Sequence, residues 1–230
     1  MSLLDKRIQT QIKIIEDLKK LKSAIIETSF YSPFEHFPQT YSLLRLTDFT
    51  KRITKKNNTC GISLVLTIAA NYGLVSQEEY FNKSVASNNL SNYTIINKDD
   101  FAYNKSYSRE YPWGAIKRLN NYPTGILSPL YYCFSINKHI VDSDYLMLYF
   151  ESTKWHRQIS DIAGEGARNH GLLNIAIPDF FNSCHVVPPI ETQRKISKYL
   201  MLLLDKIQLE EKTLSLLNLQ KKYLLQTLFI

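Results

Sequence analysis

The sequence predicts a mixed α/β (α+β) globular domain flanked by two long helices. Three observations lead to this fold class: the two ends of the chain repeat each other, both ends carry apolar residues at helical spacing, and the middle contains short runs of β-branched and aromatic residues. All 7 Gly and 8 Pro lie between Ser32 and Pro189, so neither predicted end helix is interrupted. The 230 residues have room for one packed core.

The terminal repeat divides the chain into four parts. The tetrapeptide Leu-Leu-Asp-Lys at 3–6 recurs at 203–206, and after a slip of one residue the segment 8–30 aligns with 207–229. Identical pairs in this alignment include Ile8/Ile207, Gln9/Gln208, Lys22/Lys221, Thr28/Thr227 and Phe30/Phe229. We therefore expect an N-terminal helix over 1–30, a linker over 31–40, a globular domain over 41–187 and a C-terminal helix over 188–230 that starts after Pro188 and Pro189.

Both end helices carry an apolar seam whose residues are three or four positions apart, the spacing of a coiled coil. The seam residues are Ile8, Ile15, Leu18 and Ile25 in the first helix and Leu200, Leu203, Ile207, Leu214, Leu217, Leu224 and Leu228 in the second. A helix from Glu191 to Ile230 would be about 60 Å long, more than a domain of this size can cover. We therefore expect partner helices and, with the two seams at opposite ends of the globular domain, a homodimer formed through them.

The middle of the chain predicts both strands and a helix. Runs rich in β-branched and aromatic residues at 64–68, 93–96, 126–134 and 175–177 are bounded by Asn, Gly and Pro and predict strands. Residues 144–162 predict a helix because Leu146, Tyr149, Phe150 and Ile159 fall near one face. The prolines between 32 and 38 mark the hinge that follows the first helix.

Composition favours an intracellular protein with a polyanionic partner. The formal net charge is +7 and the isoelectric point is about 9.1. Three scattered Cys without a CxxC pair predict neither a disulfide framework nor a zinc site. No apolar run reaches the length of a membrane span and the N-terminus does not resemble a signal peptide, so we expect a cytoplasmic protein without a membrane partner.

Two clusters of basic and polar residues are candidates for double-stranded DNA binding. Basic side chains contact phosphates, while Asn, Ser, Tyr and Arg side chains can read base edges. The candidates are Lys51, Arg52, Lys55 and Lys56 in one cluster and Tyr103, Asn104, Lys105, Ser106, Tyr107, Arg109, Lys117 and Arg118 in the other. The alternative is that the first cluster is a solvated turn and that the tyrosines belong to the core.

A third candidate is the segment 164–171, which is rich in Gly and contains Arg168, Asn169 and His170. Its spacing is not that of a phosphate-binding loop, because it lacks GxGxxG and no Lys-Ser/Thr follows. As a flexible loop it could contact the DNA backbone or a protein partner. The alternative is a helix C-cap followed by a turn.

No motif in the sequence predicts catalysis. The five His residues show no metal-ligand spacing, and there is no GxSxG, no paired acidic nuclease motif and no cofactor loop with an Asn/Asp-Pro-Pro-aromatic tetrapeptide. The residues therefore indicate a binding protein that is not an enzyme and holds neither a metal nor a cofactor.

Several segments, taken in their order along the chain, resemble the specificity (S) subunits of Type I restriction-modification enzymes. The segments 187–196, 204–207 and 220–226 are similar to the conserved helical region of that family. The segments 101–107, 114–119 and 166–175 are similar to parts of its target recognition domains. The resemblance extends over nearly the whole chain.

This resemblance implies a globular domain that reads a short DNA half-site and helices that form an antiparallel coiled coil and dock methyltransferase (M) subunits. It also implies that S-adenosylmethionine acts in the M subunits, whereas ATP and magnesium serve a restriction (R) subunit. An S subunit of this family has two recognition domains and this chain has one, so we expect one half-site per chain and an interrupted palindrome for a homodimer. The alternative is a coiled-coil interaction adaptor, or a truncated S subunit without autonomous DNA binding.

Overall fold

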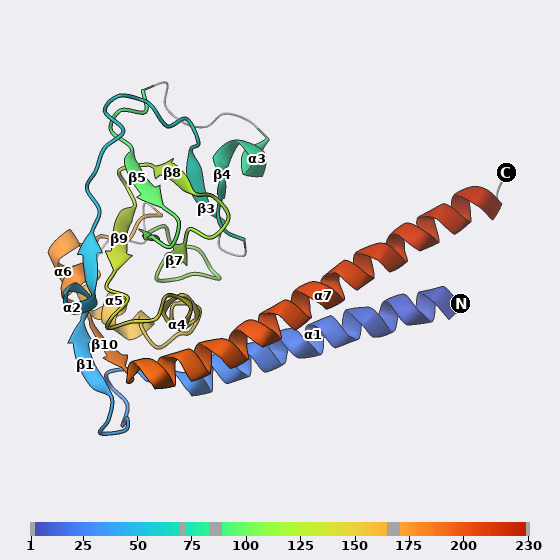
Figure 1. Ribbon diagram of the computed structural model, residues 1–230, viewed down its shortest axis with the longest axis horizontal. Helices are drawn as coiled ribbons and strands as arrows, with labels where there is room; N and C mark the ends of the chain where they lie inside the picture. The colour runs from blue at the N-terminus through green and yellow to red at the C-terminus, as the bar shows by residue number, and fades with distance from the viewer. Residues whose placement is uncertain (1–2, 70–71, 83–88, 165–170, 229–230) are drawn as a thin grey trace.

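The computed structural model describes residues 3–69, 72–82, 89–164 and 171–228. Figure 1 shows a globular body and two long helices, α1 (Leu3–Ser29) and α7 (Ile190–Leu228), which extend from it side by side with both chain ends at the far tip. The predicted fold class is confirmed: a mixed α/β body carries long terminal helices that pack against each other. No helix in these residues is both long and apolar enough to cross a membrane.

A four-stranded antiparallel sheet forms the centre of the body, in the order β2-β9-β6-β7. Its strands are β2 (Thr50–Arg52), β6 (Phe101–Asn104), β7 (Ala115–Arg118) and β9 (Tyr132–Ile136). Three two-stranded antiparallel sheets surround it. They pair β1 (Ser42–Arg45) with β10 (Cys184–Val187), β3 (Leu66–Ala69) with β4 (Gly73–Ser76), and β5 (Thr94–Asn97) with β8 (Thr124–Leu127).

The two faces of the central sheet bury different clusters, because successive residues of a strand point to opposite faces. On β6, Phe101 and Tyr103 belong to an aromatic cluster on one face, whereas Ala102 lies with Cys133 of β9 in a smaller cluster on the other. Helices cover the aromatic face, and the strand pairs β3-β4 and β5-β8 cover the second face. The helices of the body are α2 (Leu46–Phe49), α3 (Gln77–Phe81), α4 (Ser143–Tyr149), α5 (His156–Ile162) and α6 (Ile177–Asn182).

Three of the elements predicted for the middle of the chain need correction. The run 126–134 is the end of β8 and the start of β9, separated by a turn in which Tyr131 N–H donates to the Ser128 carbonyl. The predicted helix 144–162 is two helices, because Ser152 Oγ donates to the Tyr149 carbonyl at 2.7 Å and so caps the end of α4. The predicted strand 175–177 is wrong: Ile177 begins α6, with Pro178 in the first turn, where proline is tolerated.

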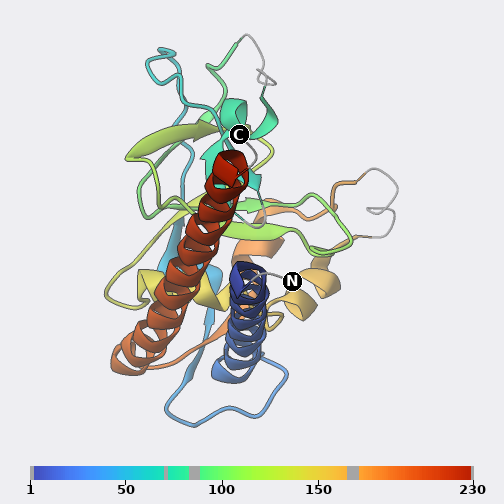
Figure 2. The same cartoon turned by 90° about the vertical axis from the view of Figure 1, so that its right-hand side faces the viewer.

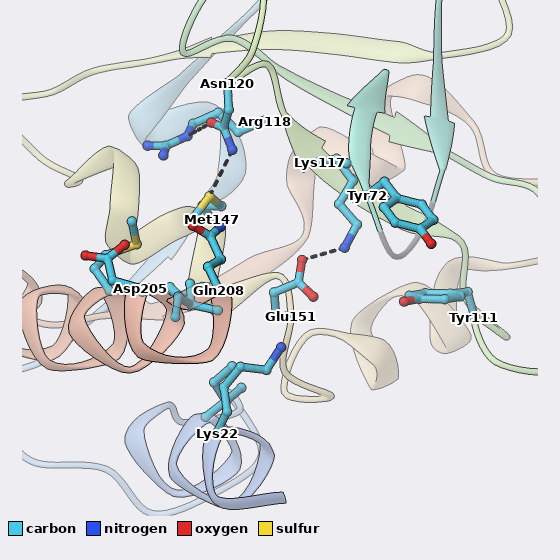
Figure 3. Close-up of a pocket in the computed structure, with 15 residues that line it drawn as sticks. Lys22, Tyr72, Tyr111, Lys117, Arg118, Asn120, Met147, Glu151, Asp205 and Gln208 are labelled. Carbon is cyan, nitrogen blue, oxygen red and sulfur yellow. Dashed lines mark hydrogen bonds and ion pairs between the residues drawn. The ribbon is translucent and has the colours of Figure 1, made fainter. Parts of the chain in front are cut away.

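The helix pair is antiparallel and has an internal near-symmetry that follows from the repeat. Gln11 Nε2 donates to the carbonyl and the carboxylate of Glu210, and these two residues occupy equivalent positions in the aligned segments. Toward the tip, Lys221 forms an ion pair with Asp5 at 2.7 Å. Toward the body, the equivalent residues Lys22 and Asp205 line one cavity, as Figure 3 shows. The two halves of the pair thus repeat each other about the contact between Gln11 and Glu210.

The roots of both long helices are held in the body. Phe30, just after α1, is 2% exposed and packs edge-on against Tyr145 and Tyr149. At the start of α7 the amide of Gln193 is fully buried; it donates to the carbonyls of Ile140 and Pro188 and accepts from Asp142 N–H. These contacts fix the direction in which the helix pair leaves the body.

A buried histidine predicts acid sensitivity of the fold. His185 is hydrogen-bonded to Tyr149 and Ser183 at 2.9 Å each, and burial lowers its pKa from 6.5 to about 3. Below pH 6.5 the unfolded chain therefore binds a proton that the folded chain does not, and this residue makes the free energy of unfolding fall by about 1.4 kcal/mol per pH unit as the pH drops toward 3. The free energy of unfolding, measured by urea unfolding at several pH values between 7 and 4, should fall less steeply with decreasing pH in His185→Gln than in the wild type. In His139→Gln, a change at the surface, its pH dependence should match that of the wild type. Equal slopes for all three proteins would contradict this assignment.

Candidate nucleic-acid interface

The first basic cluster lies along one exposed edge of the central sheet. Lys51, Arg52, Lys55 and Lys56 are all exposed, and β2, which carries the first two, is an edge strand. The chain stays extended beyond β2, because Ile53 N–H donates to the Cys133 carbonyl at 2.8 Å. Within the described part of the chain none of the four basic side chains forms an ion pair; Lys56 Nζ donates to Thr94 Oγ1 at 3.1 Å. This edge therefore presents unneutralised positive charge to solvent.

The second candidate surface is the loop between β6 and β7. Ser106, Tyr107 and Arg109 are exposed, and Asn104 is half-buried. Asn104 Oδ1 accepts from Ser106 N–H and Oγ–H at 3.1 and 2.9 Å, an Asx turn that holds the start of the loop. The loop thus combines hydroxyl, amide, phenol and guanidinium groups on one exposed segment.

Backbone hydrogen bonds join this loop to the segment that follows the third candidate. Tyr107 N–H donates to the Gly171 carbonyl at 2.8 Å, and Leu173 N–H donates to the Lys105 carbonyl at 2.9 Å. The β6–β7 loop and the end of the segment 164–171, which are far apart in the sequence, therefore lie side by side at Gly171. Arg168, Asn169 and His170 themselves lie outside the described residues.

Strand register places the two exposed clusters toward the same end of the sheet. Arg52 and Phe101 both pair with Phe134, so β2 and β6 run in the same direction on either side of β9. The continuation of β2 to Lys55 and the loop after Asn104 therefore lie at the same end of the sheet, where β2 and β6 both finish. With one strand between them, their backbones are about 10 Å apart at that level.

Three of the predicted contact residues lie inside the body, which corrects the expectation that they face a ligand. Tyr103 is 0% exposed; its ring stacks on Phe180 at 4.6 Å, and burial raises its pKa. Lys117 is 8% exposed and paired with Glu151 at 2.5 Å. Arg118 is paired with Asp144 at 2.7 Å at the first turn of α4. The two cations hold β7 against the helices.

Lys105 occupies an intermediate position. Its side chain is half-buried, and its Nζ donates to Tyr132 Oη at 3.1 Å and lies 5.0 Å from the centre of that ring. Tyr132 Oη in turn donates to the Ile175 carbonyl at 2.6 Å. Lys105 therefore ties the base of the loop to the sheet.

Sequence reasoning missed one polar neighbour of the basic edge, Thr94. The antiparallel bridge between Lys56 and Thr94 brings the start of β5 beside the cluster, where Lys56 Nζ donates to Thr94 Oγ1. Nothing in the sequence signals this, because Thr94 is far from 51–56 along the chain.

A cavity of about 360 Å³ lies where the helix pair meets the body. Figure 3 shows Lys22 of α1 pointing toward Glu151, which is paired with Lys117, and Asn120 against Met147 on the opposite wall. The polar contacts of Lys117, Arg118 and Asn120 in its lining join the end of β7 and the residues after it to α4 and to Glu151 just beyond α4. Among the described residues no group of three His, Cys, Asp or Glu side chains could hold a metal ion.

The predicted seam residues of the two long helices face each other within one chain. Ile8, Ile15, Leu200, Ile207 and Leu217 are buried, Leu18, Ile25, Leu203 and Leu214 are half-buried, and Leu224 is exposed. The side chain of Leu228 lies outside the described residues. The expectation that the seams lie at opposite ends of the body is wrong, because α1 and α7 leave it on the same side (Figure 2).

A second copy has a worse match to this seam than α1 has. Gln11 of α1 and Glu210 of α7 occupy equivalent positions in the repeat and contact each other. If a second α7 took the place of α1, Glu210 would therefore lie opposite Glu210 of the other copy. Hydrogen bonds from Lys206 and Gln11 lower the pKa of Glu210, which keeps it charged. The seam therefore favours the pairing within one chain.

Comparison with solved structures identifies the architecture. The HsdS subunit from Thermoanaerobacter tengcongensis is similar over 97% of this chain and 52% of its own, with a TM-score of 0.61 and 14% identity. This chain has the fold of a Type I specificity subunit. The S subunit from M. genitalium is similar over 97% of this chain and 57% of its own, with a TM-score of 0.55 and 15% identity.

A third similar chain comes from work on the complex assembly and conformational transition of the type I R-M system. The similarity extends over 97% of this chain and 54% of that chain, with a TM-score of 0.59 and 14% identity. This chain thus spans about half the length of the S-subunit structures that it matches. No protein-family model and no curated protein matches the sequence.

A glycine fixes the loop between β6 and β7, and this gives a testable prediction. Gly114 has φ +78°, and a Cβ there would lie 2.3 Å from the Asn104 carbonyl oxygen. Gly73 has a similar φ of +84° but open space around it, so Gly73→Ala should cost only the backbone strain of about 1–2 kcal/mol. Gly114→Ala should lower the free energy of unfolding, measured with urea, by clearly more than Gly73→Ala, since backbone atoms must also move. An equal decrease in the free energy of unfolding for both variants would show that the contact with Asn104 does not constrain the loop.

Proposed function

We propose that this chain is a DNA-specificity subunit of a Type I restriction-modification enzyme, with a globular body that reads one half-site of double-stranded DNA. The observation that carries the proposal is the exposed basic edge beside the polar β6–β7 loop, on a body whose fold matches S subunits over 97% of this chain. A charged edge of this kind binds phosphates without regard to sequence, so specificity must come from the loop.

The division of labour follows from the side chains available at each surface. Lys51, Arg52 and Lys55 act as point charges on the DNA backbone and set the salt dependence of binding. Ser106, Tyr107 and Arg109 offer hydrogen-bonding groups that fit base edges in a groove, with Arg109 suited to guanine. The Asx turn at Asn104 orients the loop so that these groups meet the DNA together.

The helix pair serves assembly in this proposal. It docks the methyltransferase subunits, which bind S-adenosylmethionine, and through them the restriction subunit, which uses ATP and magnesium. The described residues of this chain do not fit any of these groups, since they include neither a glycine-rich cofactor loop nor an acidic metal cluster. The chain contributes recognition and leaves the chemistry to its partners, and a second copy contributes the second half-site.

One observation favours a second candidate function, an interaction adaptor without autonomous DNA binding. Tyr103, Lys117 and Arg118, a quarter of the basic and polar set predicted from the first two clusters, serve the fold. An adaptor would use the body as a protein-binding module and the helix pair as its scaffold.

The basic edge gives the first test of the proposal. Replacing Lys51 and Lys55 together by Ala should weaken binding to all DNA sequences alike and reduce the slope of log affinity against log salt by about 0.9 for each lost phosphate contact. The matched control is the replacement of two exposed helix lysines, Lys13 and Lys195. Fluorescence anisotropy at several salt concentrations measures both quantities, and an unchanged slope in the edge variant would refute the assignment.

Selection of bound oligonucleotides from a random pool separates the two candidate functions. With the methyltransferase subunit present, we expect an interrupted palindrome, because identical domains on opposite strands read identical half-sites. Arg109→Ala should relax the preference at one position of each half-site at a cost of about 1–3 kcal/mol there. A pool that shows no enrichment would support the adaptor and rule out the specificity subunit.

A further inference from the structure

Two carboxylates connect the end of α1 and the linker to the segment between α4 and α5. The carboxylate of Glu27 accepts hydrogen bonds from Thr153 N–H and Thr153 Oγ–H, both at 2.8 Å. The carboxylate of Glu35 forms an ion pair with Lys154 at 2.7 Å and accepts from Ser32 N–H at 2.9 Å. These two contacts lower the pKa of Glu35, which keeps it charged. Charged groups near the surface therefore join the two segments.

An aromatic contact extends this junction. The guanidinium carbon of Arg157 lies 3.9 Å from the centre of the Phe34 ring, within the range of a cation–π interaction. The linker itself is compact, since the rings of Tyr31 and Tyr41 near its two ends meet edge-on at 5.6 Å. It contains two prolines and no glycine, which restricts its backbone. The contacting residues form what we call the linker clamp: Glu27, Phe34 and Glu35 on one side and Thr153, Lys154 and Arg157 on the other.

Just beyond the linker clamp, the cavity of about 360 Å³ separates the helix pair from the body. Its lining includes Lys22, little more than one turn before Glu27 on α1, and Gln208 of α7, together with Tyr111 of the body (Figure 3). The described residues of α7 that pack against the aromatic cluster end at Leu204. The helix pair is therefore held at its root and has space to tilt outside it.

The length of the helices amplifies any change of angle at the root. From Glu27 to Leu3 the helix α1 extends for about 36 Å, and Figure 1 shows that the outer parts of both helices lie beyond the body. A tilt of about 10° at the root would move the tip by about 6 Å. Successive phosphates of one DNA strand are about 3.4 Å apart along the axis, so this displacement corresponds to nearly two base pairs.

Apolar packing alone does not define this angle sharply. Phe30 and Leu200 anchor the two helices in the aromatic cluster, but the hydrophobic effect has no preferred direction. Hydrogen bonds, in contrast, weaken steeply when the donor is misaligned. The two bonds from Thr153 to Glu27 and the ion pair of Glu35 therefore resist rotation of the helices about their apolar anchors.

We propose that the linker clamp sets the angle between the helix pair and the body and thereby determines which spacer length between two half-sites is accepted. Glu27, Glu35 and Lys154 are positioning residues in this proposal, because they act through the helices and not by contact with DNA. The effect on the spacer rests on the proposed function, whereas the effect on the angle does not.

A distance within one chain tests the effect on the angle without DNA. One spin label is placed on Cys60, which is exposed in the body, and a second on α7 through Gln220→Cys. The labelled chain also carries Cys184→Ser, and Cys133 is buried. Double electron–electron resonance then reports the distance between body and helix pair, and an excess of unlabelled full chain suppresses distances between copies. We expect one narrow distance distribution.

Removal of both clamp carboxylates should widen this distribution. We expect Glu27→Ala combined with Glu35→Ala to make it at least twofold wider. The matched control, Glu16→Ala combined with Glu78→Ala, removes the same charge at exposed positions outside the linker clamp and should leave the distribution unchanged. An equally narrow distribution in the clamp variant, or a broad one already in the wild type, would overturn the proposal.

Two replacements of Lys154 separate positioning from stability. Lys154→Met keeps the apolar stem and loses the charge, so it should widen the distribution, whereas Lys154→Arg can still pair with Glu35 and should keep it narrow. Because ion pairs near the surface contribute little to stability, neither change should lower the melting temperature by more than a few degrees. Equal distributions in these two variants would show that the ion pair does not set the angle.

Selection from random oligonucleotides with the methyltransferase subunit present tests the effect on recognition. The wild type should select one spacer length, and the variant without both clamp carboxylates should accept spacers about one or two base pairs shorter or longer between unchanged half-sites. An unchanged single spacer in that variant would overturn the inference. A wild type that enriches no sequence would refute the proposed function and with it the effect on the spacer, whereas the distance distributions would still confirm or refute the role of the linker clamp in setting the angle.

Discussion

The packing of α1 against α7 determines how the rest of the molecule can be used. A helix of 39 residues exposes more surface than a body of this size can cover, and α1 covers the seam over the part nearest the body. Both helices are rooted in the aromatic cluster, α1 through Ile26 and Phe30 and α7 through Leu200. Because the same cluster also holds one face of the central sheet, the direction of the helix pair and the position of the loop that leaves β6 are fixed by one core.

The elements that could be predicted are those set by local periodicity. Both long helices and most of the seam residues followed from three-and-four spacing, because one face of each helix is buried along much of its length, although Leu224 near the end of α7 is exposed. The boundaries within the body did not follow, since the tertiary contacts of a few residues decide them. Trp155 Nε1 donates to the Phe150 carbonyl and Ser152 caps α4, so an apolar pattern that suits one helix is divided into two. Pro178 and the packing of Phe180 likewise turn a β-branched run into the start of α6.

The candidate interface was predictable only where charge is exposed. Lys51 to Lys56 remained on the surface, whereas Lys117 and Arg118 are paired with Glu151 and Asp144, acids that lie 34 and 26 positions away along the chain. A one-dimensional count of basic residues cannot distinguish these cases, because neutralisation depends on which helix packs against the strand. The same limit explains Thr94, which lies beside Lys56 only through a bridge between segments 38 positions apart along the chain.

The seam between α1 and α7 also carries polar residues that determine which helices pair. Gln11 opposite Glu210 forms a hydrogen-bonded contact that a second α7, paired in the same manner, would replace by two carboxylates. Toward the tip, Lys221 forms an ion pair with Asp5. A seam between two similar helices needs such a distinction, since apolar residues alone would allow either helix as the partner. The leucines and isoleucines of the seam therefore supply the buried area, whereas Gln11 and Glu210 specify the pairing within one chain.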